Sequence, residues 1–172
     1  HFGIESGLND YIVVGSGMQA IQLALQAVAG AGDECVYLSP AWPNFAAALE
    51  VAGGKAVPVT LDFSENGWTL DLERFEAAIT PRTKWLILNS PSNPSGAGYS
   101  RTRIQALSDV LLRHPHVLIM TDDMYEHVWY AASPFATIAQ VCPELYDRTL
   151  TVNGCSKAFS MTGWRIGFAG GP

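Results

Sequence analysis

Strand-like apolar runs alternate with helical patterns along almost the whole chain, and this alternation limits the folds open to it. Residues 17–29 carry apolar side chains at helical spacing, among them Ala20, Ile21, Ala24 and Leu25. Alternation of this kind predicts a mostly parallel sheet covered by helices on both faces. The predicted strands are 11–14, 34–38, 55–60, 84–89, 117–121, 149–153 and 165–169, and the further predicted helices are 45–52, 72–79, 101–113 and 136–141.

The last connection differs from the others, because only residues 154–164 separate the sixth and seventh strands. A parallel crossover needs a dozen or more residues. The seventh strand is therefore predicted to be antiparallel, in a three-layer α/β/α sandwich with a seven-stranded sheet. Arg165, its first residue, would then lie at the edge where the other strands end, which is where open α/β sheets bind ligands.

Composition excludes several classes of partner. The net charge of −6 and the lack of a basic cluster argue against nucleic acid, and no apolar run predicts a membrane span. Three cysteines, Cys35, Cys142 and Cys155, lack the spacing of a metal site. We expect no metal and a reduced, cytoplasmic protein.

Lys157 is the lysine that chemistry singles out among three. Lys55 and Lys84 each come just before an apolar run, as exposed lysines at strand starts do, whereas Lys157 follows an apolar strand in a run of small residues. A lysine with low solvent access can lose its proton and attack a carbonyl to form a Schiff base.

Two further strand ends carry groups suited to a phosphorylated ring. Gly15, Ser16, Gly17 and Met18 follow the first strand and open a helix, where backbone N–H groups can hold an anion. Trp42 follows the second strand and can either join the core or stack on a flat ring.

Polar side chains come after the fourth and fifth strands. Asn93, in a turn with a candidate cis bond to Pro94, carries an amide that could donate to a ring oxygen. Asp122 follows a fully apolar strand and is either a turn cap or the partner of a cation. Tyr125 could donate to a ring oxygen, and Arg165 could pair with a phosphate. Together these groups are what a phosphorylated pyridine aldehyde requires.

The chain resembles the large domain of class I/II aminotransferases, the fold-type I pyridoxal phosphate enzymes, and is most similar to bacterial aspartate aminotransferases. The likeness covers essentially all 172 residues. Its most specific part is the string from Ser156 to Arg165 with Ile-Gly after it, which matches the lysine signature of that family. Asn-Pro-Ser-Gly and Asp-Asp-Met-Tyr-Glu match two further family motifs in the right order.

The resemblance implies a role for each catalytic candidate. Lys157 forms the Schiff base with pyridoxal 5'-phosphate and later moves the proton. Asp122 keeps the pyridine nitrogen protonated. Asn93 and Tyr125 hydrogen-bond the phenolic oxygen.

It also implies which residues hold the rest of the cofactor. Trp42 stacks on the ring, while Ser16, Gly17 and Met18 hold the phosphate and Arg165 pairs with it. One departure is Gly154, where many relatives have a serine that also contacts the phosphate.

Family members are roughly twice as long, with a segment before this domain and a small domain after it. We therefore expect residues 1–172 to be the cofactor-binding large domain of a partial chain that is inactive alone. The arginine that binds the substrate carboxylate would lie outside it, and the full-length protein would be a homodimer.

The sequence leaves the reaction open. The leading hypothesis is an aminotransferase that moves an amino group between an L-amino acid and a 2-oxo acid. Carbon–sulfur lyases and cyclopropane-carboxylate synthases use the same fold and cofactor motifs. An aminotransferase-like sensor domain of a transcription regulator is a further alternative.

Overall fold

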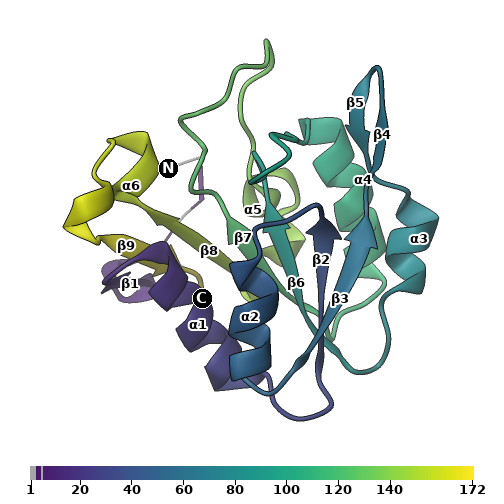
Figure 1. Cartoon of the computed structure of the whole chain (residues 1–172), viewed down its shortest axis with the longest axis horizontal. Coiled ribbons are helices and arrows are strands. Elements are labelled where there is room, and N and C mark those ends of the chain that lie inside the picture. The colour runs from purple at the N-terminus through teal and green to yellow at the C-terminus, as the bar shows by residue number, and fades with distance from the viewer. Residues whose placement is uncertain (1–2, 5) are drawn as a thin grey trace.

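The computed structural model describes residues 3–4 and 6–172, and its centre is a seven-stranded sheet in the order β1-β9-β8-β7-β6-β2-β3 (Figure 1). The pairs β2–β3, β2–β6, β6–β7 and β7–β8 are parallel, whereas β9 runs antiparallel to both β1 and β8. The predicted sandwich with an antiparallel last strand is confirmed. Its strands are β1 (Tyr11–Val14), β2 (Glu34–Ser39), β3 (Lys55–Thr60), β6 (Thr83–Asn89), β7 (Leu118–Asp122), β8 (Thr149–Gly154) and β9 (Gly167–Gly170).

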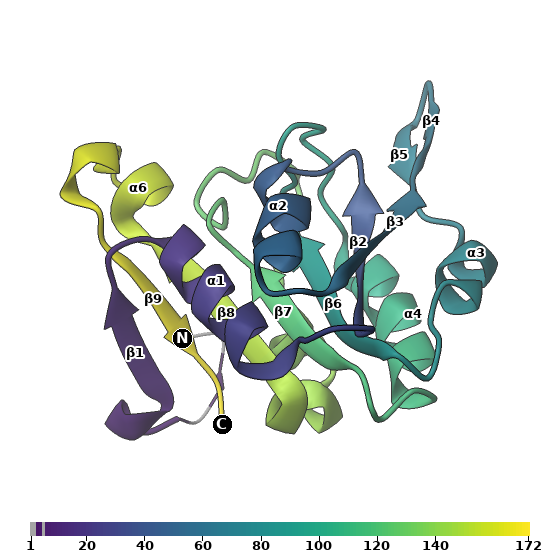
Figure 2. The same ribbon diagram turned by 60° about the horizontal axis from the view of Figure 1, so that its bottom comes forward.

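Alternating side chains explain why both faces of this sheet are covered. Along β6, Leu86 and Leu88 join one apolar core, whereas Trp85 and Ile87 join the other. Helices α1 and α2 cover the second face, and α3, α4 and α5 cover the first (Figure 2). Their bounds are α1 (Gly17–Val28), α2 (Asn44–Val51), α3 (Leu72–Ala77), α4 (Arg101–Leu112) and α5 (Ile138–Val141).

The start of the last strand was predicted wrongly. Arg165 lies two residues before β9 and has a left-handed backbone, with φ of 53°. Strand pairing begins only at Gly167, which lies opposite both Val14 and Gly154. The turn at Arg165 comes from the short 3-10 helix η3 (Thr162–Trp164), which redirects the chain before it can pair.

Several short elements were not predicted. A hairpin of β4 (Asp62–Ser64) and β5 (Gly67–Thr69) projects beyond the sheet, and α6 (Cys155–Ala158) follows β8 directly. The other additions are the 3-10 helices η1 (Leu8–Asp10) and η2 (Pro143–Arg148). The two hairpin strands have only three residues each, fewer than the four to eight over which alternation marks a strand.

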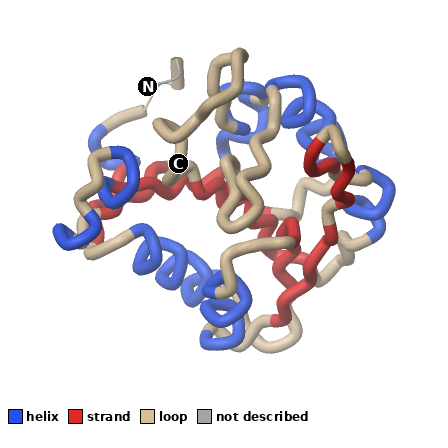
Figure 3. The backbone as a smooth tube through the Cα atoms, turned by 45° about the horizontal axis from the view of Figure 1, so that its top comes forward, coloured by secondary structure: helices blue, strands red, loops and turns tan. Residues whose placement is uncertain are grey.

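The parallel strands all end at one edge of the sheet, and their connecting loops lie over it (Figure 3). This edge therefore collects polar residues from distant parts of the chain. Within residues 3–4 and 6–172, no helix has both the length and the apolar character needed to cross a membrane.

Candidate active site

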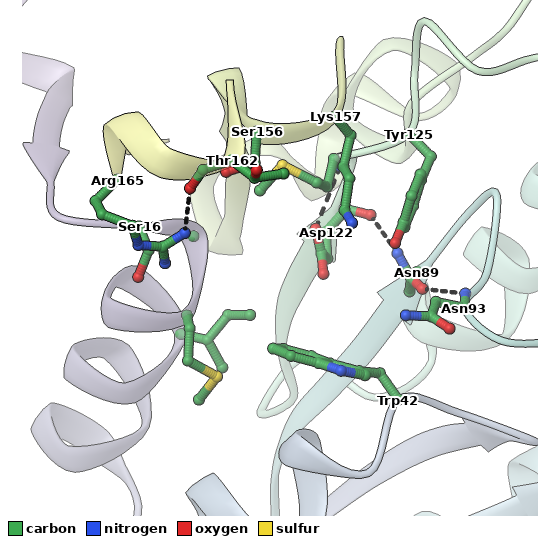
Figure 4. A pocket seen from close by; sticks show the side chains of 14 residues that line it. Ser16, Trp42, Asn89, Asn93, Asp122, Tyr125, Ser156, Lys157, Thr162 and Arg165 are labelled. Carbon is green, nitrogen blue, oxygen red and sulfur yellow. Dashed lines mark hydrogen bonds between the residues drawn. The ribbon is translucent and has the colours of Figure 1, made fainter. Parts of the chain in front are cut away.

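A cavity of about 210 Å³ opens at this edge of the sheet and brings together residues that the sequence predicted for a cofactor site (Figure 4). The loops after β1, β2, β6 and β7 contribute to it, as do α6 and the turn before β9. The predicted residues that line it are Ser16, Gly17, Met18, Trp42, Asn93, Asp122, Tyr125, Lys157 and Arg165, and they are joined by Ile21, Asn89, Met124, Ser156 and Thr162.

The first turn of α1 forms one end of the cavity. Ser16 caps this helix, because its Oγ accepts a hydrogen bond from the Gln19 N–H at 3.2 Å. Its hydroxyl hydrogen remains free to donate to a ligand. The N–H groups of a helix start and the positive end of its dipole favour an anion at this end.

Arg165 and Thr162 close the same end from the other side. The Arg165 guanidinium donates to the Thr162 backbone carbonyl at 2.9 Å, an arrangement visible beside Ser16 in Figure 4. Arg165 precedes β9 rather than beginning it, but its side chain still lines the cavity. A cation, a hydroxyl and a helix start together suit a phosphate group.

Asp122 is the buried acidic residue that lines the cavity. It is the last residue of β7 and only 7% exposed, and burial raises its pKa from 3.8 to about 6, although a hydrogen bond from the Met124 N–H opposes the rise. Among the described residues, no cationic side chain pairs with it. A ligand cation placed here would therefore gain a buried counter-charge.

Two asparagines stand beside Asp122. Asn89, the last residue of β6, donates from Nδ2 to the Asp122 carbonyl at 2.9 Å and accepts on Oδ1 from the Asn93 N–H at 2.9 Å. The Asn93–Pro94 bond is cis, as predicted, and so are Ser39–Pro40 and Ser90–Pro91. Asn89 was named in sequence only as a strand end and is the residue that sequence reasoning missed.

Trp42 lies across the cavity from Lys157, in the loop after β2 (Figure 4). Its ring meets Phe45 edge to face, with centroids 5.7 Å apart. This contact with a buried side chain of α2 fixes the indole and leaves a flat face available to a ring in the cavity.

Lys157 belongs to α6 rather than to a loop, and its side chain is exposed. The expectation of low solvent access is wrong for the chain as described, because α6 lies at the rim of the cavity. Its Nζ lies 5.8 Å from the centre of the Tyr125 ring. In Figure 4 the amine lies toward Tyr125 and away from the anion-binding end of the cavity.

Asp123 belongs to a different site. Successive strand residues point to opposite faces, so Asp123 enters a second cavity with Glu126 and His127. Its Oδ1 accepts from the Thr121 hydroxyl at 2.5 Å. The turn after β7 is capped by Asp122, which accepts from the Met124 N–H.

Comparison with known proteins places the chain in a family. The sequence pattern of the family described as aminotransferase class I and II matches residues 2–172. The aspartate aminotransferase of Rhizobium meliloti is 50% identical over 99% of this chain and 42% of that protein. An aspartate/prephenate aminotransferase of Cereibacter sphaeroides is 52% identical over 99% of this chain and 44% of that protein.

Solved structures agree with this assignment. A crystal structure of the Rhizobium meliloti enzyme superposes with a TM-score of 0.94 at 48% identity, covering 99% of this chain and 42% of that one. The Thermus thermophilus aspartate aminotransferase gives a TM-score of 0.90 at 41% identity, with coverage of 99% and 43%. The chain thus spans less than half the length of these relatives. With the family pattern matching nearly every residue, the chain belongs to the class I and II aminotransferase family.

Proposed function

We propose that the protein containing this chain is a pyridoxal phosphate-dependent aminotransferase, and that residues 1–172 are its cofactor-binding large domain. The observation that carries the proposal is one cavity lined by a lysine, a buried carboxylate and a helix start with an arginine beside it. Among the relatives are enzymes named for aspartate and prephenate, so we propose aspartate as the first amino donor to test.

The residues fit this cofactor on physical grounds. Buried Asp122 lacks a cationic partner among the described residues, and a protonated pyridine nitrogen would supply one. The opposite end of the cavity offers the donors and the positive charge that a phosphate needs. When bound, pyridoxal phosphate supplies an electron sink for the bonds of the substrate Cα.

Each side chain then has a definite task. Lys157 Nζ would hold the cofactor through its aldehyde group and would act as the base that moves the Cα proton. Asp122 would keep a proton on the ring nitrogen. Asn93 and Tyr125 would orient the ring through its phenolic oxygen, and Trp42 would pack against the ring.

The anion end of the cavity has a task of its own. Ser16, Gly17 and Met18 bind the phosphate through the Ser16 hydroxyl and the backbone N–H groups, and Arg165 adds its positive charge. Fixing the phosphate fixes the distance between the ring and Lys157, which is how binding energy orients the reacting atoms.

The proposal extends to the assembly and its location. We propose a homodimer, on the strength of the family resemblance, to be checked by sedimentation of the full-length protein. A cytoplasmic location is supported by three free cysteines, Cys35, Cys142 and Cys155, and is checked by cell fractionation.

The deciding experiment is chemical trapping in the full-length protein. Pyridoxal phosphate should give a yellow absorbance band, and borohydride should fix the cofactor on Lys157, as read by peptide mass mapping. A label on Lys55 or Lys84 instead would overturn the assignment. Incubation with aspartate and a 2-oxo acid should yield the matching oxo acid and amino acid, whereas loss of a carbon–sulfur bond from a thioether amino acid would favour a lyase.

A further inference from the structure

Asn89 occupies a position that connects two groups of the proposed site. It ends β6 directly opposite Asp122 in the parallel register, and only 8% of it is exposed. Its side chain points into the same cavity as Asp122 and Asn93 (Figure 4). A buried amide at such a place must have its donors and acceptor matched by neighbours.

The two hydrogen bonds of Asn89 fix its orientation. Nδ2 donates to the Asp122 carbonyl and Oδ1 accepts from the Asn93 N–H, each at 2.9 Å. A flipped amide would set a donor against the Asn93 N–H and an acceptor against the Asp122 carbonyl, so only one orientation is compatible.

The peptide between Asp122 and Asp123 is held from both sides. Its carbonyl accepts from Asn89 on β6, and its N–H donates to the Val152 carbonyl on β8 at 2.9 Å. Asn89 therefore supplies one of the two restraints on the backbone from which the Asp122 carboxylate emerges.

Asn93 depends on the same side chain. Its backbone N–H is bound by Asn89, while its own side-chain amide has no hydrogen-bond partner among the described residues. The position of that amide in the cavity is thus set by the backbone, and the backbone by Asn89.

We propose that Asn89 is a positioning residue, whose single amide fixes the distance between Asp122 and Asn93. These are the groups assigned to the ring nitrogen and to the phenolic oxygen, so the inference rests on the proposed function. Its side-chain amide is bonded to Asp122 and Asn93, so Asn89 acts through these neighbours.

The test is a pH titration of the absorbance of bound pyridoxal phosphate in the full-length protein. A hydrogen bond donated to the phenolic oxygen stabilises its negative charge and favours release of the cofactor's proton. In Asn89→Ala, the displaced Asn93 amide should no longer reach that oxygen. The midpoint of the titration should then rise by about one pH unit.

Ser90→Ala is the matched control. Ser90 is the next residue and is also buried. Its replacement by alanine removes one hydrogen bond, which the Ser90 Oγ accepts from the Tyr99 N–H at 3.0 Å. It does not line the cavity. Both variants should lower the melting temperature of the cofactor-free protein, but Ser90→Ala should leave the titration midpoint unchanged. Equal midpoints in Asn89→Ala and the wild type would overturn the inference.

Combining substitutions tests the route of the effect. Asn93→Ala alone should raise the midpoint, and adding Asn89→Ala should raise it little further, because residues acting in series are not additive. Full additivity would mean that Asn89 does not act through Asn93. Should Asn89→Ala fail to fold, Asn89→Ser carries the same expectation. A wild-type protein that shows no titrating band would sink the proposed function itself, which is a distinct outcome.

Discussion

Lys157 Nζ lies 5.8 Å from the centre of the Tyr125 ring, although the two residues come from different connections of the sheet. Tyr125 follows β7 and Lys157 follows β8, and these two strands are parallel neighbours. Their ends therefore meet at one edge, and the ring face attracts the ammonium group. This contact holds the amine over the cavity before any ligand arrives.

Replacing Lys157 with alanine should reduce amino transfer by at least about 100-fold, because the base that moves the Cα proton is lost. Cofactor should remain bound without a covalent link, so borohydride treatment followed by denaturation should leave no cofactor attached to the protein. Lys84→Ala is the control, since this exposed lysine at the start of β6 lies outside the cavity. Turnover retained in Lys157→Ala would rule this lysine out as the base.

The adjacent carboxylates should differ sharply in their effect on catalysis. Asp122 lines the cavity of the proposed site, whereas Asp123 points to the opposite face of the sheet. Asp122→Asn should lower the turnover number by about 100-fold or more, because the charge that holds the ring proton is removed. Asp123→Asn should leave turnover within a few-fold of wild type. Steady-state kinetics reporting the reverse order would mean that the wrong carboxylate was chosen.

Much of the fold could be predicted because its signals are local. The continuous apolar run of β6 reflects burial on both faces of the sheet, and the helical stripe of α1 reflects burial on one side of the helix, so both can be recognised without knowing the topology. The short link between β8 and β9 predicted their antiparallel pairing correctly. The rule that parallel strands end at one edge then predicted correctly that these nine residues meet in one cavity.

The residues whose role or position was not predicted have a feature in common, because each depends on the tertiary structure. Asn89 takes its importance from neighbours four and thirty-three positions away, which no sequence window reveals. Arg165 was placed in a strand because its left-handed turn depends on the preceding η3. The exposure of Lys157 follows from the position of α6 at the cavity rim, a tertiary feature.

Arg165→Ala should weaken binding of pyridoxal phosphate by about tenfold or more, since a charge-assisted hydrogen bond contributes about 1.5–3 kcal/mol. Fluorescence titration of the cofactor-free protein measures the dissociation constant. Arg101→Ala is the matched control, because this exposed arginine begins α4 and lies outside the cavity. Equal affinity in the two variants would remove Arg165 from the phosphate site.

Gly167→Ala should disrupt the anion-binding end of the cavity, because Gly167 packs closely against the backbone at the start of α1. A Cβ at Gly167 would lie 2.3 Å from both the Gly17 nitrogen and the Ser16 carbonyl carbon. Both are backbone atoms and cannot rotate away, so β9 or the start of α1 must shift. We expect a loss of about 1–3 kcal/mol in the free energy of unfolding, together with weaker cofactor binding.

The control for this substitution is Gly163→Ala, where an added Cβ has no neighbour within 4 Å among the described residues. Urea unfolding and cofactor titration should both remain close to wild type in that variant. Comparable losses at the two glycines would show that the close approach of β9 to α1 is not what constrains residue 167.

Asp123 should make the folded protein less stable as pH rises. Burial raises the pKa of this carboxyl from 3.8 to about 7, although the hydrogen bond from the Thr121 hydroxyl opposes the rise. Between about pH 4 and pH 7 the folded state keeps a proton that the unfolded chain releases. The unfolded state then binds fewer protons, so the free energy of unfolding falls across this window.

Asp123→Asn removes this cost, because an amide of the same shape cannot ionise and can still accept the Thr121 hydroxyl through its Oδ1. At pH 8 the variant should be more stable than wild type by at least about 1 kcal/mol, since each pKa unit corresponds to about 1.4 kcal/mol. At pH 4, where the wild-type carboxyl is protonated when folded, that advantage should vanish. Urea unfolding at the two pH values measures the difference, with Glu65→Gln as the exposed control. If the variant were more stable by the same amount at both pH values, its extra stability would come from packing and not from the ionisation of Asp123.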